Sequence, residues 1–249
     1  MSTNGDQFPV PADASQRQIP ISDKANPIEE ELAKLAEISA LPSAKAKEML
    51  LLPENVHGLA ILDVGGGASD MTATLLEMGA DAHAIDPRYR KKSEINTTII
   101  SQIRYGPYDL KIKMLINKTL QRFMASIKAS PERYKAASAT RIPFPDHSFD
   151  IVFSIDTITA FLDRDRDVFF QSMKECFRVT KPGGLLKFLP FQDMQPAWSP
   201  EVNALRLSND EYLLNWLKNN PEVEGIELIN TTVKYHHRLT FKKKAGRQR

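Results

Sequence analysis

The stretch from Leu59 to Asp70, Leu-Ala-Ile-Leu-Asp-Val-Gly-Gly-Gly-Ala-Ser-Asp, decides the fold of this chain of 249 residues. The apolar run 58–64 predicts a buried strand, and 71–78 predicts a helix that Gly79 ends. Three glycines between a strand and a helix allow a tight turn and let a ligand lie on the main chain. The pattern indicates a nucleotide-type site; the alternative is a turn that merely needs glycine.

A second strand is expected at 81–86, and it ends in an acidic residue. Asp86 follows Asp63 by 23 residues, a spacing at which a carboxylate can accept both hydroxyls of an adenosine ribose. The alternative is a solvated carboxylate at a strand end. A pyrophosphate-binding fingerprint read from Gly65 needs glycine at position 70, where Asp70 stands and would repel phosphate. Adenosine without phosphates therefore fits better than NAD.

Outward from this unit, short apolar runs alternate with amphipathic stretches. This alternation predicts an α/β fold, with a doubly wound, mostly parallel seven-stranded sheet, helices on both faces and a final antiparallel hairpin. In the last strand, apolar residues alternate with polar ones, which is typical of a strand with one buried face. The remaining strands are expected at 134–138, 149–155, 185–189, 226–231 and 233–241, and further helices at 43–51 and 165–178.

The composition, 42% hydrophobic and 26% charged, is that of a globular protein and excludes a wholly disordered or collagen-like chain. We expect a disordered tail at 1–26, one domain at 27–241 and a basic tail at 242–249. No apolar stretch is long enough to span a membrane, and the N-terminus lacks a secretory pattern. The single cysteine, Cys176, fits a reducing compartment, so we expect a cytoplasmic protein.

Four segments, in order, resemble the successive signatures of class I S-adenosylmethionine-dependent methyltransferases. They are ILDVGGGASD, HAID, ATRIPFPDHSFDIVFS and MKECFRVTKPGGLLKF. The resemblance covers about residues 59–188 and, more weakly, the last two strands. It implies an enzyme that takes a methyl group from S-adenosylmethionine.

The resemblance also implies roles for single residues. Asp63 and the glycines lie under the methionine part of the cofactor, Asp86 holds the ribose, and Pro87 lies near the adenine. Ser138 stands where the family often has an aspartate that meets the adenine amine, and Ser69 stands where a third glycine is usual. The residues expected to bind the cofactor are Asp63, Gly65, Gly66, Gly67, Asp86, Pro87, Ser138, Ala139 and Ser154.

Asp156, at the end of the fourth strand, is the candidate catalytic residue. It could orient a substrate amine or hydroxyl, or hold the cofactor's amino group through water; the alternative is that Asp156 or Thr157 caps a helix. The histidines show no metal-ligand spacing, so no metal is expected. Methyl transfer needs alignment more than a dominant catalytic side chain. A small-molecule acceptor is our first expectation. The alternatives are a methyltransferase-like binding protein with weakened or lost catalysis, or an RNA or protein methyltransferase that uses the basic insertion.

Charge is unevenly distributed along the chain. The net charge is −9 over residues 1–86, +9 over 87–135, −5 over 136–233 and +7 over 234–249. Residues 87–135 form an expected helical insertion, with an amphipathic helix at 110–128. Three readings are open for it: a helix packed on the domain, a membrane-surface helix, or, as we favour for 104–135, a lid over the substrate. RNA, protein or an anionic membrane would contact the basic tail and the polar face at Lys111, Lys118 and Arg122.

Overall fold

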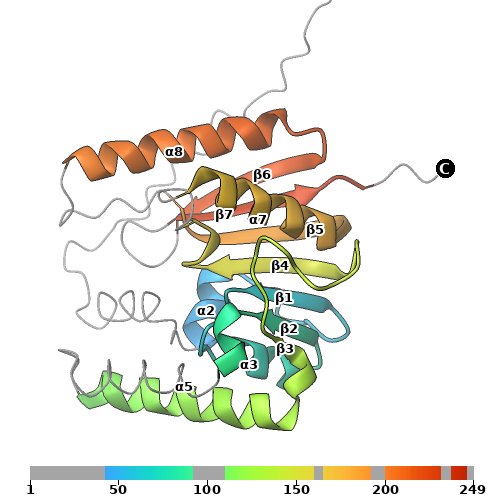
Figure 1. Cartoon of the computed structure of the whole chain (residues 1–249), viewed down its shortest axis with the longest axis vertical. Helices are drawn as coiled ribbons and strands as arrows, with labels where there is room; N and C mark the ends of the chain where they lie inside the picture. The colour runs from blue at the N-terminus through green and yellow to red at the C-terminus, as the bar shows by residue number, and fades with distance from the viewer. Residues whose placement is uncertain (1–42, 92–109, 160–164, 192–199, 231–236, 246–249) are drawn as a thin grey trace, which may run out of the picture.

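The computed structural model describes residues 43–91, 110–159, 165–191, 200–230 and 237–245. These residues build one seven-stranded sheet in the order β3-β2-β1-β4-β5-β7-β6 (Figure 1). The expected tail at 1–26 lies outside the described residues, as do residues 246–249 of the basic tail expected at 242–249. Lys242 and Lys243 of that tail belong instead to the last strand.

The sheet is parallel from β3 to β5, and β7 runs antiparallel between β5 and β6. This confirms the predicted doubly wound sheet with an antiparallel end. The strands are β1 (Ala60–Val64), β2 (Asp81–Ile85), β3 (Tyr134–Lys135), β4 (Phe149–Ile155), β5 (Thr180–Phe191), β6 (Val223–Asn230) and β7 (His237–Lys243).

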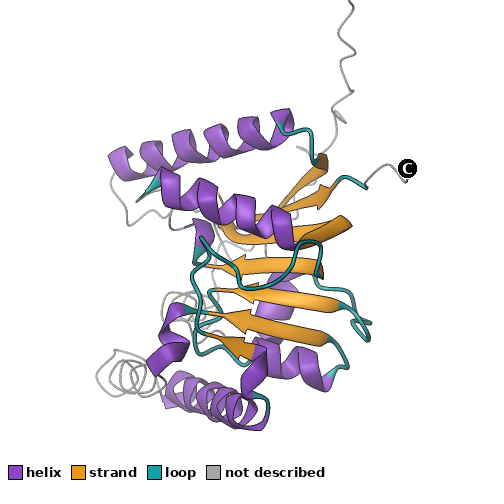
Figure 2. Cartoon of the chain, turned by 45° about the vertical axis from the view of Figure 1, so that its right-hand side comes forward, coloured by secondary structure: helices purple, strands orange, loops and turns teal. Residues whose placement is uncertain are grey.

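Helices cover both faces of the sheet (Figure 2). One face packs against α2 (Ser43–Leu50), α3 (Met71–Glu77) and α5 (Leu110–Ala129); the other packs against α7 (Arg166–Val179) and α8 (Pro200–Asn219). Two short 3₁₀ helices, η1 (Pro87–Lys91) and η2 (Pro131–Arg133), flank α5 in the chain. Cys176 lies on the buried face of α7, where it is a small residue of the core.

The lid that we expected at 104–135 is wrong for the residues that the structure describes. Ile116, Leu120, Phe123 and Ile127 of α5 are buried in the same core as α2 and α3. α5 therefore serves as the crossover helix between β2 and β3. Its amphipathic pattern arises because one face completes the core.

The one-sided burial expected for the last strand is also wrong. Leu239 and Phe241 lie in the core under α7 and α8, as expected, but Arg238 and Thr240 are buried as well. The Arg238 Nε donates to the Thr240 Oγ1 at 3.1 Å. Residues on both faces of β7 are therefore buried.

Candidate functional site

Three loops lie at the carboxyl ends of adjacent parallel strands. The glycine loop, Gly65–Gly67, follows β1; η1 follows β2; and a loop that starts at Asp156 follows β4. The strand order reverses between β1 and β4, because β2 lies on one side of β1 and β4 on the other. Open α/β sheets bind ligands at such a switch point, so the sheet places the predicted site residues where a ligand would lie.

The glycine loop is fixed by the main chain of β2. The backbone N–H groups of Gly65 and Gly66 both donate to the carbonyl of Ile85, at 2.8 and 3.2 Å. Gly65 has a φ of +81°, and a Cβ added there would lie 2.2 Å from the Oγ1 of Thr157. Gly65 must therefore be glycine because the loop after β4 packs directly on it.

Asp86 is not the solvated carboxylate of our alternative interpretation. It is 3% exposed, and four donors surround it. Its Oδ1 accepts from the backbone N of Arg88 at 2.8 Å and from the Arg88 Nε at 2.9 Å. Its Oδ2 accepts from the Arg88 Nη2 at 2.8 Å and from the Gly67 N at 3.1 Å. The carboxylate thus joins the glycine loop to η1.

Asp63 lies beneath the glycine loop as a second buried carboxyl group. Burial, and then the negative charge of Asp86, raise the pKa of Asp63 to about 8. A Cβ added at Gly66 would lie 3.0 Å from the Asp63 Oδ2 and 2.9 Å from the Tyr89 hydroxyl, so both groups sit directly under the loop. At neutral pH the protonated carboxyl can donate a hydrogen bond there.

Tyr89 is a site residue that sequence reasoning missed. It is buried, and burial together with the charges of Asp63 and Asp86 raises its pKa well above the usual value. Its ring contacts Phe123 of α5 and Tyr134 of β3, with ring centroids 6.0 and 5.7 Å apart. The available signal was its place in the first turn after Asp86, where a 3₁₀ helix turns the side chain back under the loop.

Arg122 does not form part of an exposed basic face, so that expectation was wrong. Its Nη1 lies 2.5 Å from the Asp70 Oδ2, and its Nη2 donates to Thr74 at 3.1 Å and to Glu77 at 2.7 Å. The other oxygen of Asp70 accepts from the Ser43 backbone N at 2.8 Å. This pairing also corrects the argument that an uncompensated Asp70 would repel phosphate.

The loop after β4 is held by Ser154. Its buried Oγ accepts from the backbone N of Ile158 at 3.2 Å, so Ser154 makes a capping contact that we had considered for Asp156 or Thr157. Asp156 has a φ of +52°, and its backbone N donates to the carbonyl of Leu189 at 2.7 Å. Its side chain is half-buried at the carboxyl edge of the sheet.

Ser138 and Ala139 follow β3 at the same edge of the sheet. Ala139 is buried, whereas Ser138 is exposed. The Ser138 Oγ lies 2.9 Å from the Thr140 Oγ1 and accepts from the Thr140 backbone N at 3.2 Å. The hydroxyl therefore closes a local turn at the position where the family often has an aspartate.

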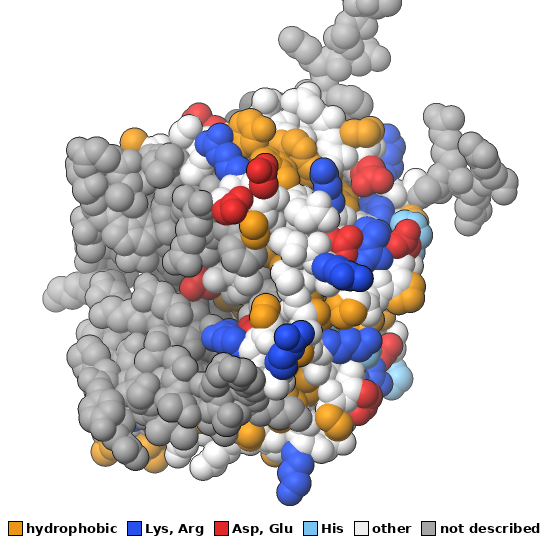
Figure 3. All heavy atoms as spheres, viewed as in Figure 1, with side chains coloured by type: hydrophobic (Ala, Val, Ile, Leu, Met, Phe, Trp, Pro, Cys, Tyr) orange, Lys and Arg blue, Asp and Glu red, His pale blue; other side chains and the backbone are white. Residues whose placement is uncertain are grey.

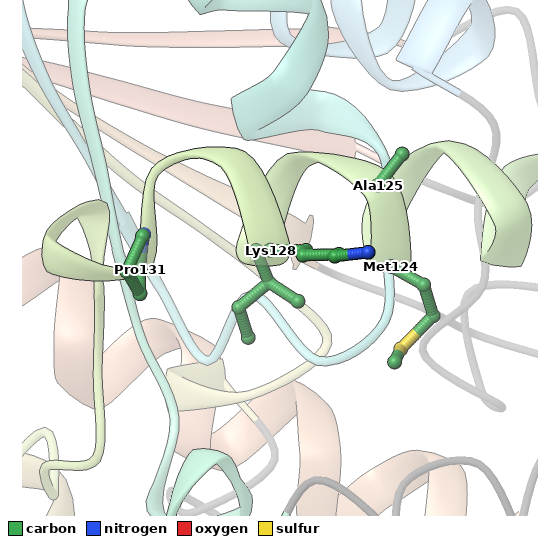
Figure 4. Close-up of a pocket in the computed structure, with 5 residues that line it drawn as sticks. Met124, Ala125, Lys128 and Pro131 are labelled. Atoms are coloured by element: carbon green, nitrogen blue, oxygen red, sulfur yellow. The ribbon is translucent and has the colours of Figure 1, made fainter.

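On the face of the molecule in Figure 3, basic and acidic side chains of the described residues are interspersed and do not form a large patch of one charge. A hollow of about 570 Å³ lies along the C-terminal half of α5 and the start of η2 (Figure 4). It is lined by Met124, Ala125, Ile127, Lys128 and Pro131. None of these residues belongs to the three loops, so the hollow is separate from the candidate site.

Two features are absent from the part of the chain that the structure describes. Within the described ranges, no group of three or more His, Cys, Asp or Glu side chains could hold a metal ion. None of the helices described is both long and apolar enough to cross a bilayer.

Comparisons with known proteins agree with the fold and the sequence motifs. A family model described as "Methyltransferase domain" matches residues 108–188. The ubiquinone/menaquinone biosynthesis C-methyltransferase of Shewanella frigidimarina is 30% identical over 158 residues, which are 62% of this chain and 49% of that protein. The Shewanella sediminis protein of the same name is 26% identical over 187 residues, 72% of this chain and 61% of that one. The chain thus spans about half to three fifths of these curated relatives.

A solved structure shows the same fold. The phosphoethanolamine N-methyltransferase 2 of Haemonchus contortus, solved with phosphomonomethylethanolamine and S-adenosylhomocysteine, superposes with a TM-score of 0.50 at 16% identity. The match covers 91% of this chain and 61% of that one. The sheet order and the loop after β1 define a class I α/β methyltransferase fold. The family model and the relatives show that the central part of the chain is similar to methyltransferases.

Proposed function

We propose that this chain transfers a methyl group from S-adenosylmethionine to a small-molecule acceptor. The observation that carries the proposal is the position of Asp86, which directly follows β2 and whose carboxylate lies 3.1 Å from the Gly67 N of the glycine loop. A carboxylate there can accept ribose hydroxyls beside a main chain that a ligand can approach closely. The names of the curated relatives support a small acceptor, since they denote C-methylation in quinone biosynthesis.

Each group in the site has a role in this proposal. Asp86 accepts the ribose hydroxyls, and the glycine loop supports the methionine part of the cofactor with Asp63 beneath it. Ser154 holds the loop after β4, so that Asp156 stands at the edge where an acceptor amine or hydroxyl would arrive. The cofactor supplies an activated methyl carbon when bound. The protein then has to align the acceptor in line with that carbon and exclude water.

Calorimetry with S-adenosylhomocysteine tests the proposal. Asp86→Ala should weaken binding by about 1 to 3 kcal/mol, because the ligand loses hydrogen bonds to a charged group. Asp81→Ala is the matched control: Asp81 begins the same strand at its far end and is exposed. That variant should bind like the wild type. No heat at millimolar ligand would refute cofactor binding, and unchanged affinity in Asp86→Ala would remove Asp86 from the site.

A methyltransferase-like binding protein with weakened or lost catalysis is the second candidate. It is favoured by the hydrogen bonds that Arg88 already makes to Asp86, and by the serine at position 138. Release of S-adenosylhomocysteine from the labelled donor in the presence of quinone-like phenols separates the two. Binding without turnover across such acceptors would favour the second candidate. A cytoplasmic location, expected from the single cysteine, remains part of the proposal.

A further inference from the structure

Hydrogen bonds within the protein occupy every acceptor position of the Asp86 carboxylate. A carboxylate offers about four acceptor positions, two on each oxygen. Four donors occupy them here: the backbone N–H groups of Arg88 and Gly67, and the Nε and Nη2 of the Arg88 guanidinium. A ribose that donates two hydroxyl hydrogens to Asp86 would find no vacant position.

The two partners differ in how easily they can leave. The side chain of Asp86 is 4% exposed, whereas that of Arg88 is 44% exposed. The guanidinium can therefore swing into water at little cost in solvation, while the carboxylate cannot. Its departure would vacate two acceptor positions, one on each oxygen, and leave both backbone donors in place. Two vacated positions equal the number of hydroxyls in a ribose diol.

We propose that Arg88 is an internal competitor of the cofactor ribose, whose guanidinium must leave Asp86 before an adenosyl ligand can bind. The inference rests on the proposed function, because it assigns Arg88 a role at the cofactor site. Binding is then an exchange: two guanidinium hydrogen bonds to Asp86 break and two ribose hydrogen bonds form. Arg88 sets the affinity for the cofactor without contributing to the chemical step.

The expected effect follows from the fraction of molecules in which Asp86 is vacant. When a binding-competent state is populated by a fraction f, the apparent dissociation constant is the intrinsic one divided by f. A competitor that is in place in about nine of ten molecules weakens binding roughly tenfold. Arg88→Met keeps the length of the side chain but removes the guanidinium. We therefore expect it to bind S-adenosylhomocysteine roughly tenfold more tightly than the wild type.

Calorimetry with S-adenosylhomocysteine on five full-length proteins tests the inference: wild type, Arg88→Met, Arg90→Met, Asp86→Asn and the double variant of Arg88→Met with Asp86→Asn. Arg90 is exposed on the same 3₁₀ helix, so its variant removes one nearby positive charge without touching Asp86. We expect Arg90→Met to bind like the wild type. The effect of Arg88→Met should disappear in the Asp86→Asn background, because Arg88 acts through that carboxylate.

Other results would overturn the inference. Equal or weaker binding by Arg88→Met would mean that Arg88 supports the site rather than competes for it. Equal tightening in Arg90→Met, or tightening that persists with Asp86→Asn, would mean a bulk charge effect. If Arg88→Met melts well below the wild type, Arg88→Lys replaces it, since lysine keeps the charge but cannot bridge both oxygens. It should bind more tightly than the wild type.

The same experiment separates this inference from the proposed function. If the wild type binds and Arg88→Met binds no better, the competitor is refuted while cofactor binding stands. If only Arg88→Met binds, both are supported. If none of the five proteins binds at millimolar S-adenosylhomocysteine, cofactor binding is refuted and the competitor with it.

Discussion

Replacing Arg122 by methionine should destabilise the domain, because it removes the partner of a buried carboxylate. Asp70 has a side chain that is 4% exposed and is held by Arg122 and by the Ser43 backbone N. Removing one partner of a buried ion pair costs about 3–5 kcal/mol. The Arg122 side chain is 33% exposed, so water can reach part of the vacated space, and we expect a loss of about 2 kcal/mol. That is roughly 4–8 °C in melting temperature for a domain of this size.

Urea and thermal unfolding followed by circular dichroism measure this loss. Lys118→Met is the matched control, since Lys118 is exposed on the same helix, and it should stay within about 0.5 kcal/mol of the wild type. Glu77→Gln removes the exposed arm of the Arg122 contact and should cost less than about 1 kcal/mol. Adding Asp70→Asn to Arg122→Met should recover part of the loss, because an amide is less costly to bury than a charge. If Arg122→Met is no less stable than Lys118→Met, the reasoning fails.

Two further predictions concern the glycine loop. Gly65→Ala should lower the free energy of unfolding by about 2–3 kcal/mol, because the strain of a positive φ and the clash with Thr157 add to each other. Gly58→Ala is the control: Gly58 has a φ of +75° but nothing within 4 Å of an added Cβ, so this variant should lose only about 1 kcal/mol. Equal losses in urea titrations would contradict the contact. Asp63, with a pKa of about 8 against an ordinary 3.8, keeps its proton in the folded state between pH 4 and 8 while the unfolded chain has lost it. Its contribution to stability is therefore full below about pH 4 and falls by up to about 1.4 kcal/mol per pH unit towards pH 8. Asp63→Asn should flatten that fall in urea midpoints from pH 5 to 8, and parallel curves for the two proteins would rule out the raised pKa.

Much of the sheet could be predicted because each strand carries its own local signal. The apolar run 149–155 coincides with β4, and the predicted helix at 165–178 differs from α7 by one residue at each end. The alternation of apolar and polar residues gave a wrong prediction where burial depends on the surrounding elements and not on the strand's own sequence, as for Arg238 on β7. The helix α8 was not predicted, because its apolar residues do not form one regular stripe, although Leu213 and Leu217 are buried.

The candidate site was predictable in its backbone and not in its side-chain partners. The glycine loop is predicted by its three consecutive glycines, and Asp86 by its position after a strand. Both are local features of the sequence. Arg122 lies 52 residues from Asp70, and the helical projection that placed it on a polar face was correct about the face. The projection could not show that α3 lies beside that face of α5, so the arginine that pairs with Asp70 was interpreted as an exposed charge. Arg88 is local, but the turn direction of η1 decides where its side chain points.

The uneven charge of the sequence is explained, in part, by pairing between its own segments. The segment 1–86 is acidic and the segment 87–135 is basic, and three arginines of the second pair with carboxylates of the first. These pairs are Arg88 with Asp86, Arg122 with Asp70 and Glu77, and Arg133 with Asp81.

This pairing changes what the charge pattern says about a partner. Arg122 and Arg133 hold the crossover between β2 and β3 against the β1-α3-β2 unit that precedes it in the chain, so their charges stabilise the domain, whereas Arg88 covers the neighbouring carboxylate of Asp86. Around the glycine loop the result is close to neutral: Asp70 and Asp86 are paired with arginines, and Asp63 retains its proton. A ligand that enters the site therefore meets no excess of positive charge, and displacement of Arg88 by a ribose would leave the negative charge of Asp86 beside it. That favours an adenosyl group bearing an amino acid over a polyphosphate, whose several negative charges would need uncompensated cations.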